Sequence, residues 1–356
     1  MILRRHVQFQ ILQAMLLASA VLLVIQTLFA FLAQVDNLSE TYTLIKAFKF
    51  VLWSTPVYFV QVMPLAALAG AVLGLGALSN QGEVTVMRAS GVNLLRVVRW
   101  ALSVAFFWVL TTLAVNQFVL PGASYQAEQI RAETKGRSLS TLSGYWNKQG
   151  SDIIFVDQAN ATGEISGLSM WRFTADDQLS ELLYAPNALF DPATERWLAT
   201  DVNRTDLKLD QQLGASAVSK PETLSISLPI NPQDLYLLTR DPSELSITDL
   251  GRFISMNEKN AQDVSQHRLM FWQKLLSPFA VLPLVMVASA FVFGSLRSSN
   301  SGLRLTAALL CGLLFSYLQE LFGYLSLLFK TSPVPFVLAP MIVFGVVGYY
   351  LIKRKQ

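Results

Sequence analysis

Five long stretches of this chain contain no Asp, Glu, Lys or Arg, and each is long enough to cross a lipid bilayer. They are Val7–Val35, Phe50–Gly82, Trp100–Ala127, Leu275–Leu296 and Thr331–Ile352. A transmembrane helix needs about 20 mostly apolar residues. A sixth stretch, Leu305–Phe329, is interrupted only by Glu320, and we count it because an odd number of spans would leave the chain ends on opposite sides. The pattern predicts three helices on each side of a polar insert.

The insert has a different pattern, with short apolar runs of period two. Such alternation is typical of half-buried strands, and we expect strands around Ile153–Val156, Leu168–Phe173, Trp197–Ala199 and Leu224–Ile230. Turn residues separate these runs, which favours an antiparallel, jelly-roll-like fold. The alternation places Phe155 and Ile226 inward. Ser246 followed by Asp249 approximates a capping box, so a helix should lead back to the membrane.

These patterns together predict an α-helical integral membrane protein with six transmembrane helices (3+3) and an inserted all-β, jelly-roll-like domain. Residues 1–127 hold the first three helices, residues 128–267 the β domain, and residues 268–356 the last three helices.

The charges support this division and indicate an orientation. Hydrophobic residues make up 53% of the chain and charged residues only 14%, against a charged share of about 25% in soluble domains. Residues 128–268 carry 13 Lys/Arg and 20 Asp/Glu, whereas the other 215 residues carry 14 and 4. The basic membrane part favours anionic lipid headgroups over nucleic acid as a partner.

Positive charge gathers at one side of the predicted spans, which by the positive-inside rule is the cytoplasm. Only Lys46, Lys49 and Lys330 lie in the short loops opposite. Both termini are then cytoplasmic and the insert lies outside. The first apolar run continues to Val35, too long for a cleaved signal peptide, so we expect an uncleaved anchor. The ten cytoplasmic basic residues are Arg4, Arg5, Arg88, Arg96, Arg99, Arg297, Arg304, Lys353, Arg354 and Lys355.

Catalytic chemistry is not indicated. The chain has one cysteine and two histidines, His6 and His267, which the predicted topology places at opposite membrane edges. Disulfides, metal centres and bound cofactors are therefore not expected. The sequence contains no G-x-x-x-x-G-K-[ST] phosphate loop, no H-E-x-x-H and no G-x-S-x-G. We expect a protein without catalytic activity of its own.

The segment of residues 80–91, between the second and third spans, has the pattern of a short amphipathic helix. Val84, Met87 and Gly91 recur at i, i+3 and i+7, while Glu83 and Arg88 carry charge. Gly91 is suited to end the helix. A cytoplasmic helix of this kind could form the contact through which an ATPase subunit transmits movement to the membrane helices. The alternative is an inert turn with one incidental acid.

Glu320 is costly at membrane depth, and acids there usually face a cavity or a partner. An ion-coupled secondary transporter could use Glu320 as its coupling residue. We favour an interhelical contact, because no second intramembrane charge accompanies Glu320. A scaffold protein would not need the amphipathic connector. A mechanotransmitting transporter subunit would carry its insert after the first helix.

Several motifs resemble the lipopolysaccharide export permeases of the LptF/LptG family. They are Val35-Asp36-Asn37-Leu38, Met63–Gly70 with Leu73-Gly74-Leu75-Gly76, Glu83 with Val86–Gly91, and the segment from Phe293-Gly294-Ser295-Leu296-Arg297 to the basic end. The resemblance covers essentially the whole chain, and its last third is more similar to the G-type than to the F-type subunits. Residues 83–91 form the most specific part.

This resemblance implies a subunit of an ATP-driven transporter in the inner membrane of a Gram-negative bacterium. Members pair as an LptF/LptG heterodimer on an LptB ATPase dimer, which binds ATP and Mg²⁺. They extract lipopolysaccharide and pass it through the periplasmic β domain to LptC and LptA. By similarity, residues 80–91 form the coupling helix, Glu83 contacts the ATPase, and spans one and five form gates against the partner subunit.

The resemblance also suggests where lipid phosphates bind. Family members carry basic residues near the outer ends of the first and third spans, and Arg131 falls on such a position. Glu128 and Ala33 stand where other members have basic residues. Phosphate contact is therefore expected from Arg131, Lys46, Lys135 or Arg137, since Arg and Lys neutralise phosphate charge.

Overall fold

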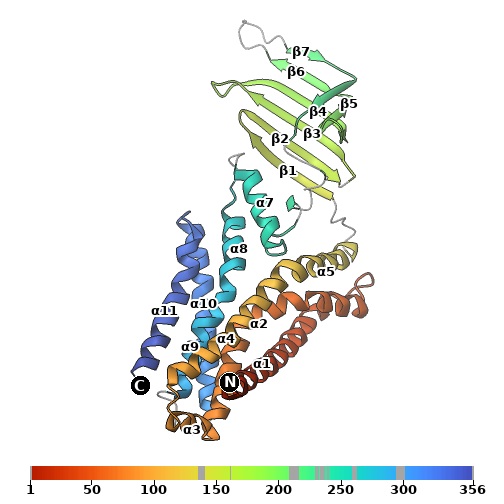
Figure 1. Ribbon diagram of the computed structural model, residues 1–356. Coiled ribbons are helices and arrows are strands. Elements are labelled where there is room, and N and C mark those ends of the chain that lie inside the picture. The colour runs from red at the N-terminus through yellow and green to blue at the C-terminus, as the bar shows by residue number, and fades with distance from the viewer. Residues whose placement is uncertain are drawn as a thin grey trace. The chain divides into compact units, whose positions relative to one another are not determined.

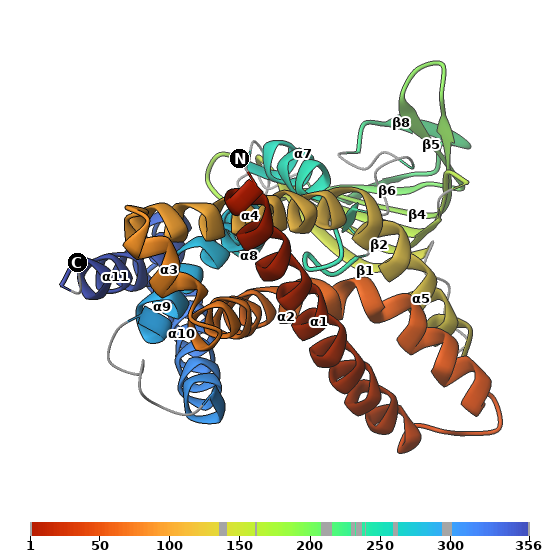
Figure 2. The same cartoon turned by 60° about the horizontal axis from the view of Figure 1, so that its bottom comes forward.

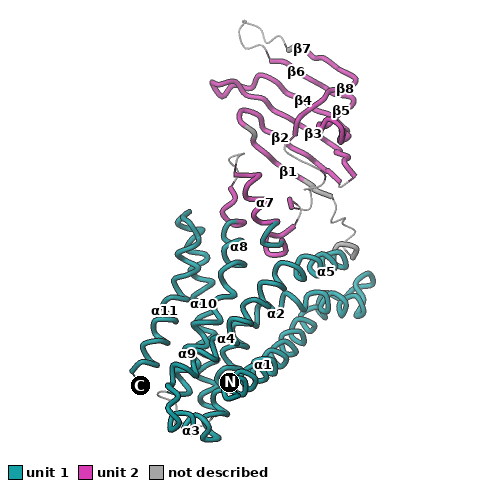
Figure 3. Tube along the Cα trace, viewed as in Figure 1, with its two compact units in different colours: residues 1–131, 246–248, 268–356 teal, residues 132–245, 249–267 magenta. Residues whose placement is uncertain are grey.

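The computed structural model describes residues 2–134, 141–160, 162–207, 216–228, 232, 237–238, 240–258, 263–293 and 301–354. The chain forms two compact units (Figure 3). Unit 1 comprises residues 1–131, 246–248 and 268–356, and unit 2 comprises residues 132–245 and 249–267. The sequence had placed the first division after residue 127.

Unit 1 is helical (Figure 1). Among the described residues, six helical segments are long and apolar enough to cross a membrane, as the sequence predicted. The helices are α1 (Ile2–Val35), α2 (Leu44–Asn80), α3 (Glu83–Ala89), α4 (Leu94–Ala114), α5 (Leu120–Thr134), α8 (Ser265–Leu276), α9 (Val281–Phe293), α10 (Ser301–Leu328) and α11 (Pro333–Lys353).

Two of the spans contain a local change of helix type next to a proline. The third span runs from α4 to α5 through a π-helical turn at Val115–Val119, which ends two positions before Pro121. The fourth runs from α8 to α9 through a 3₁₀ turn at Ser277–Ala280, which contains Pro278. Proline lacks an N–H donor and its ring crowds the preceding turn, so the helix must readjust there.

Helix α2 packs against both α1 and α10 (Figure 2). Its approach to α1 is very close. A Cβ added to Gly70 would lie 2.4 Å from the Cα of Met15, and one added to Gly74 would lie 3.0 Å from the Cα of Ile11. The Gly70-x-x-x-Gly74 pattern therefore serves helix packing within the chain, as small residues do in membranes. Met15 is fully buried at this contact.

Unit 2 contains the predicted antiparallel sheet. Its main path is β1-β2-β3-β4-β5-β8, and β6 pairs with β4 and β7. Helix α7 (Ile247–Glu258) follows at the position expected from Ser246 and Asp249. The described strands are β1 (Thr141–Gln149), β2 (Asp152–Asn160), β3 (Glu164–Phe173), β4 (Leu179–Asp191), β5 (Arg196–Thr200), β6 (Asn203–Leu207), β7 (Ser216–Ser219) and β8 (Thr223–Ile226).

One prediction about the faces of this sheet was wrong. Ile154 and Val156 of β2 enter the core of unit 2, so their neighbour Phe155 points to the opposite face. There Phe155 contacts Trp146, at 4.6 Å between ring centroids. Ile226 does lie in the core, as predicted. The expected strand around Leu224–Ile230 ends at Ile226, and residues 229 and 230 lie outside the described residues.

A charged cluster crosses β2, β3, β4 and β6. The carboxylate of Glu181 is buried and accepts from Arg172 at 2.6 Å and from Arg204 at 2.9 Å. Arg172 also contacts Asp152 at 3.1 Å. The hydrogen bond to Asp152 raises the pKa of Arg172, and the charges of Asp152 and Glu181 add to this. The guanidinium stays charged under all ordinary conditions.

Asp191 organises the tight turn between β4 and β5. Its carboxylate accepts from the Thr194 hydroxyl at 2.7 Å and from the Ala193 N–H at 3.1 Å. These hydrogen bonds, that from Thr194 first, lower the pKa of Asp191. The sequence had marked this segment as a turn, and the Asp side chain supplies the expected local hydrogen bonds.

Candidate functional site

The segment of residues 80–91 forms the expected short helix. Helix α3 begins at Glu83 after Gly82, whose φ of 76° is left-handed. Val84 and Met87 are buried against the core of unit 1. Arg88 is exposed, and Val86 is 67% exposed. Helix α3 therefore presents both an apolar and a charged side chain outward.

Gly91 ends this helix in the predicted manner. The N–H of Gly91 donates to the carbonyl of Arg88 at 3.0 Å, and the N–H of Val92 donates to the carbonyl of Met87 at 2.9 Å. This pair of bonds is a Schellman motif, which requires a left-handed residue after the helix. Gly91 has φ 85°. Glu83 in the first turn and Arg88 in the last also complement the helix dipole.

Glu83 connects α3 to α1. Its Oε2 lies 3.0 Å from Nε2 of His6. The side chains of His6 and Glu83 are 51% and 33% exposed, so both still reach the surface. The carboxylate thus holds the start of α1 while one part of it remains open to another protein.

Asn80, at the end of α2, connects the same segment to α10. The guanidinium of Arg304 donates to Oδ1 of Asn80 at 2.9 Å. Arg304 is only 4% exposed, although its charge led us to place it at the cytoplasmic surface. A hydrogen bond to a buried charged group is among the stronger ones in proteins. The first part of residues 80–91 is therefore joined to α10 through Asn80 and to α1 through Glu83.

Helices α1 and α10 are also the spans least covered by the rest of the chain. In the most apolar 18-residue stretch of each, only 17% is buried, against 67% for the corresponding stretch of α2 and 61% for that of the fourth span. Leu17 and Leu28 on α1 are 64% and 55% exposed, and Leu310 and Leu314 on α10 are 62% and 56% exposed. These two helices offer the largest apolar faces to lipid or to another membrane protein.

Arg131 lies beside the opposite end of α2, next to the loop between α1 and α2. Its guanidinium carbon stands 4.4 Å above the ring of Phe50, and its Nη1 contacts the carboxylate of Glu128 at 3.2 Å. The side chain remains 41% exposed. Burial raises the pKa of neighbouring Tyr42, and the positive charge of Arg131 opposes that rise.

Lys46 lies on α2, the helix whose Phe50 contacts Arg131. It is one turn before Phe50 on that helix, so both residues share a helix face. Its Nζ donates to the carbonyl of Thr41 at 2.9 Å. Of the four basic residues expected to contact lipid phosphate, Lys135 and Arg137 lie outside the described residues.

Glu320 is exposed on α10, within an apolar surface that includes Tyr317 and Leu321. Its Oε1 accepts from the Tyr324 hydroxyl at 3.4 Å. Among the described residues no cation forms an ion pair with Glu320. The arrangement points Glu320 away from the core of unit 1, and its expected role in an interhelical contact stays a prediction.

Sequence reasoning missed the partners that join residues 80–91 to α1 and α10. His6 and Glu83 are 77 positions apart, and Asn80 and Arg304 are 224 positions apart. His6 and Arg304 had been interpreted only as residues at a membrane edge. No local pattern in the sequence signals such pairings, because they arise from the packing of distant helices.

Comparison with known proteins gives a consistent family. The model of the family described as lipopolysaccharide export system permease LptF/LptG matches residues 5–354. The chain is 31% identical over 329 residues to the lipopolysaccharide export system permease protein LptG of Escherichia coli K12, covering 90% of each chain. It is 27% identical over 355 residues to the LptG protein of Haemophilus influenzae, covering 99% of this chain and 98% of that one.

Proposed function

This chain belongs to the lipopolysaccharide export system permease family LptF/LptG and acts in lipopolysaccharide transport, and we propose that it does so as one membrane half of a transporter driven by a separate ATPase. The observation that carries the proposal is the double connection of residues 80–91. Glu83 contacts His6 of α1, and Asn80 contacts Arg304 of α10.

The ATPase binds α3 in this proposal. The exposed Val86 and Arg88 and the partly exposed Glu83 form its contact surface, while Val84 and Met87 anchor the helix to unit 1. ATP and Mg²⁺ belong to the ATPase, of the LptB type, and this chain holds neither. Nucleotide-driven movement of the ATPase is then passed from α3 to α1 through Glu83 and to α10 through Asn80.

An F-type permease subunit is the second membrane half. The exposed faces of α1 and α10 meet it, and each is well suited to such a contact because so little of it is covered within the chain. Glu320 and Tyr324 stand on the α10 face and would be expected to meet polar groups of the other subunit there. A space between the two halves holds the lipid.

Energetics explain why the lipid must be shielded. Exposing one acyl CH₂ group to water costs about 0.8 kcal/mol, so a lipid with several long chains faces a barrier of roughly 40 kcal/mol if it leaves the membrane bare. A closing apolar space between α1, α10 and the partner helices avoids that exposure. Arg131 and Lys46, at the far end of α2 from α3, bind the lipid phosphates.

The orientation follows from the charges. The positive-inside rule applied to ten basic residues favours α3 and both chain ends in the cytoplasm, and we infer that unit 2 lies in the periplasm of a Gram-negative bacterium. The antiparallel sheet of unit 2 passes the lipid to LptC-type and LptA-type proteins. Strand β1 is paired only with β2 among the described strands, so its other edge is suited to join a partner sheet.

The experiment compares Glu83→Lys with Gln81→Lys, which introduces the same lysine side chain at an exposed position two residues away. We expect Glu83→Lys to abolish co-purification of the ATPase and lipopolysaccharide release from proteoliposomes, and Gln81→Lys to retain both. His6→Ala should keep the ATPase bound but lower the lipopolysaccharide released per ATP hydrolysed. Normal ATPase binding and release by Glu83→Lys would refute the proposal.

A further inference from the structure

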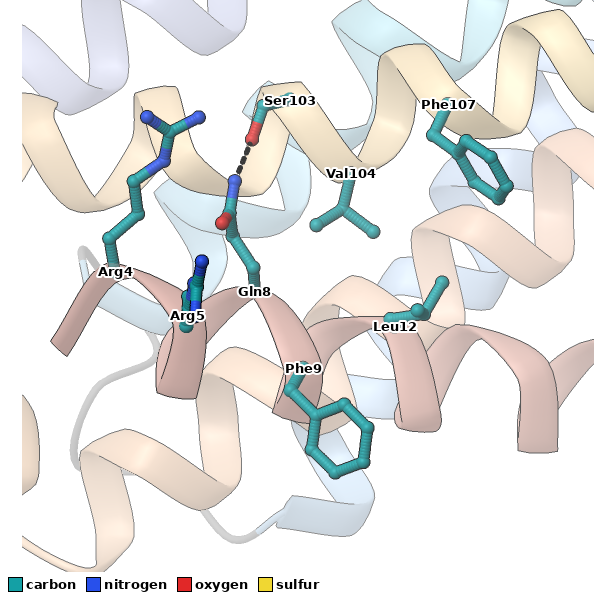
Figure 4. Close-up of a pocket in the computed structure, with 8 residues that line it drawn as sticks. All are labelled: Arg4, Arg5, Gln8, Phe9, Leu12, Ser103, Val104 and Phe107. Carbon is teal, nitrogen blue, oxygen red and sulfur yellow. Dashed lines mark hydrogen bonds between the residues drawn. The ribbon is translucent and has the colours of Figure 1, made fainter. Parts of the chain in front are cut away.

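A groove of about 610 Å³ lies between the first turns of α1 and the neighbouring part of α4. Its volume falls in the range of small-molecule sites. Figure 4 shows the groove with Gln8 of α1 and Ser103 of α4 joined across it by a hydrogen bond of 2.6 Å. This bridge divides a basic end from an apolar end.

The basic end carries Arg4 and Arg5 on α1 (Figure 4). Both side chains are exposed, and neither pairs with a carboxylate of any described residue. Arg96 and Arg99 lie on the same face of α4 as Ser103, one to two turns nearer the start of that helix. Both helices also begin at this end, so their positive dipole ends face it. Positive charge therefore accumulates at the mouth of the groove, and no carboxylate of the described residues pairs with Arg4 or Arg5 there.

The other end of the groove is apolar. Phe9 and Leu12 line it from α1, and Val104 and Phe107 line it from α4. Phe9 and Phe107 are 60% and 56% exposed. Aromatic side chains this open at membrane depth require an apolar cover, which lipid or another helix can supply.

The distance between the two ends matches a lipid. Seven residues separate Arg5 from Leu12, which corresponds to about 10 Å along a helix. This length reaches from the headgroup layer into the hydrocarbon layer of one leaflet, which is about 15 Å thick. A phosphate at the arginines and an acyl chain beside the phenylalanines would fit the groove together.

We propose that this groove binds an anionic phospholipid of the cytoplasmic leaflet. Its phosphodiester pairs with Arg4 and Arg5, and one acyl chain lies along Phe9, Leu12 and Phe107. An anionic lipid is favoured over a zwitterionic one because four arginines face the groove's mouth and no carboxylate of the described residues neutralises Arg4 or Arg5. The proposal does not depend on what the protein transports.

The bound lipid would also affect how α1 is held against α4. His6, between Arg5 and Gln8 in the sequence, points to the other side of α1 and contacts Glu83. A bound headgroup would thus hold the first turn of α1 against α4 while the opposite face engages α3. The composition of the inner leaflet would then influence the position of α1.

The test uses the full-length protein in the assembly in which it is purified, with Cys311→Ala and a single new cysteine carrying a fluorophore. Phe107→Cys places the fluorophore in the groove. Phe106→Cys is the matched control, because Phe106 is the next residue on α4, is 48% exposed and does not line the groove. The protein is placed in phosphatidylethanolamine vesicles containing a minor share of phosphatidylglycerol brominated on its acyl chains, and quenching is measured.

We expect stronger quenching at position 107 than at 106, and less quenching at 107 when the bromine is carried by phosphatidylethanolamine. Arg4→Ala with Arg5→Ala should weaken the preference for phosphatidylglycerol about 25-fold, since each basic residue at an anionic surface contributes about fivefold. Arg4→Lys with Arg5→Lys should retain most of it. Lys353→Ala with Arg354→Ala, which removes two charges at the end of α11, should leave it unchanged.

Three results would overturn the proposal. The first is equal quenching at positions 106 and 107. The second is equal quenching at position 107 by the two brominated lipids, or a preference for phosphatidylglycerol that does not change when Arg4 and Arg5 are replaced. The third is a fluorophore at position 107 that no lipid quenches and that crosslinks to another polypeptide, which would show that a partner helix fills the groove.

Discussion

The contact of α1 with α2 leads to a quantitative prediction about Gly70. An alanine Cβ there would lie 2.4 Å from the Cα and 2.7 Å from the N of Met15. Favourable carbon contacts lie at about 3.5–4.0 Å, so α1 would have to move away by about 1 Å or more. The obstructing atoms belong to the backbone and cannot rotate aside.

The magnitude follows from two opposing effects. Overpacking of this kind costs about 1–3 kcal/mol, while replacing a helical glycine by alanine gains up to about 1 kcal/mol. Gly76→Ala on the same helix is the matched control, because its Cβ would meet only Arg304 Nη1, at 3.7 Å. We expect the free energy of unfolding of Gly70→Ala to be about 1–3 kcal/mol below that of Gly76→Ala.

The assay is an SDS titration of both full-length variants in mixed micelles, followed by circular dichroism. A displaced α1 should also weaken the contact between His6 and Glu83, and so the ATPase activity of the assembly that contains Gly70→Ala should respond less to lipopolysaccharide. Equal or greater stability of Gly70→Ala would refute the close α1–α2 packing from which the argument starts.

Three further predictions concern local structure and can be measured by hydrogen exchange of the full-length protein. Hydrogen-exchange protection of the β4–β5 turn should be constant above about pH 4. It should decline as the pH falls below the ordinary pKa of Asp and through the lowered pKa of Asp191, because protonation removes the acceptor for Thr194. Asp191→Asn should remove this pH dependence. Glu181→Gln should lower the protection of β3 and β4 by about 1–3 kcal/mol, since Arg172 and Arg204 each lose the buried one of their two carboxylate partners, whereas the exposed Asp176→Asn should not. Gly91→Ala should lower the protection of α3 by about 1–2 kcal/mol, because φ at 91 is 85°, while Gly122→Ala, with open space around its Cβ, should leave α3 unchanged.

The membrane architecture could be predicted because it depends on a strong local signal. A run of about 20 apolar residues has few alternatives to a membrane helix, and all six predicted spans are helical among the described residues. The end of α3 was predictable for the same reason, since the left-handed residue of a Schellman motif is usually glycine.

The faces of β2 were not predictable, since Ile153–Val156 is continuously apolar and alternation cannot choose between its two sides. In the folded sheet Ile154 and Val156 are buried in the core, whereas Phe155 lies on the opposite face and contacts Trp146. The π-helical turn at Val115–Val119 was also missed, although Pro121 is a signal that the helix must adjust there.

The candidate site was predictable only in part. The exposed pattern of α3 identified Glu83 and Arg88, but the contacts of Glu83 with His6 and of Asn80 with Arg304 depend on how three distant helices pack. A buried arginine such as Arg304 cannot be told from a surface one by sequence position at a membrane edge. The roles of Lys46 and Arg131 toward lipid stay predictions.

The most direct test of the account is the distance between α1 and α10 during the ATPase cycle. Spin labels at Leu17 of α1 and Leu314 of α10, both exposed, would be placed in a Cys311→Ala background of the assembled transporter and measured by pulsed electron paramagnetic resonance. We predict that trapping the ATPase with nucleotide and vanadate shifts this distance, and that His6→Ala with Asn80→Ala reduces the shift while the ATPase stays bound. An unchanged distance during ATP hydrolysis would contradict the claim that α3 moves both helices.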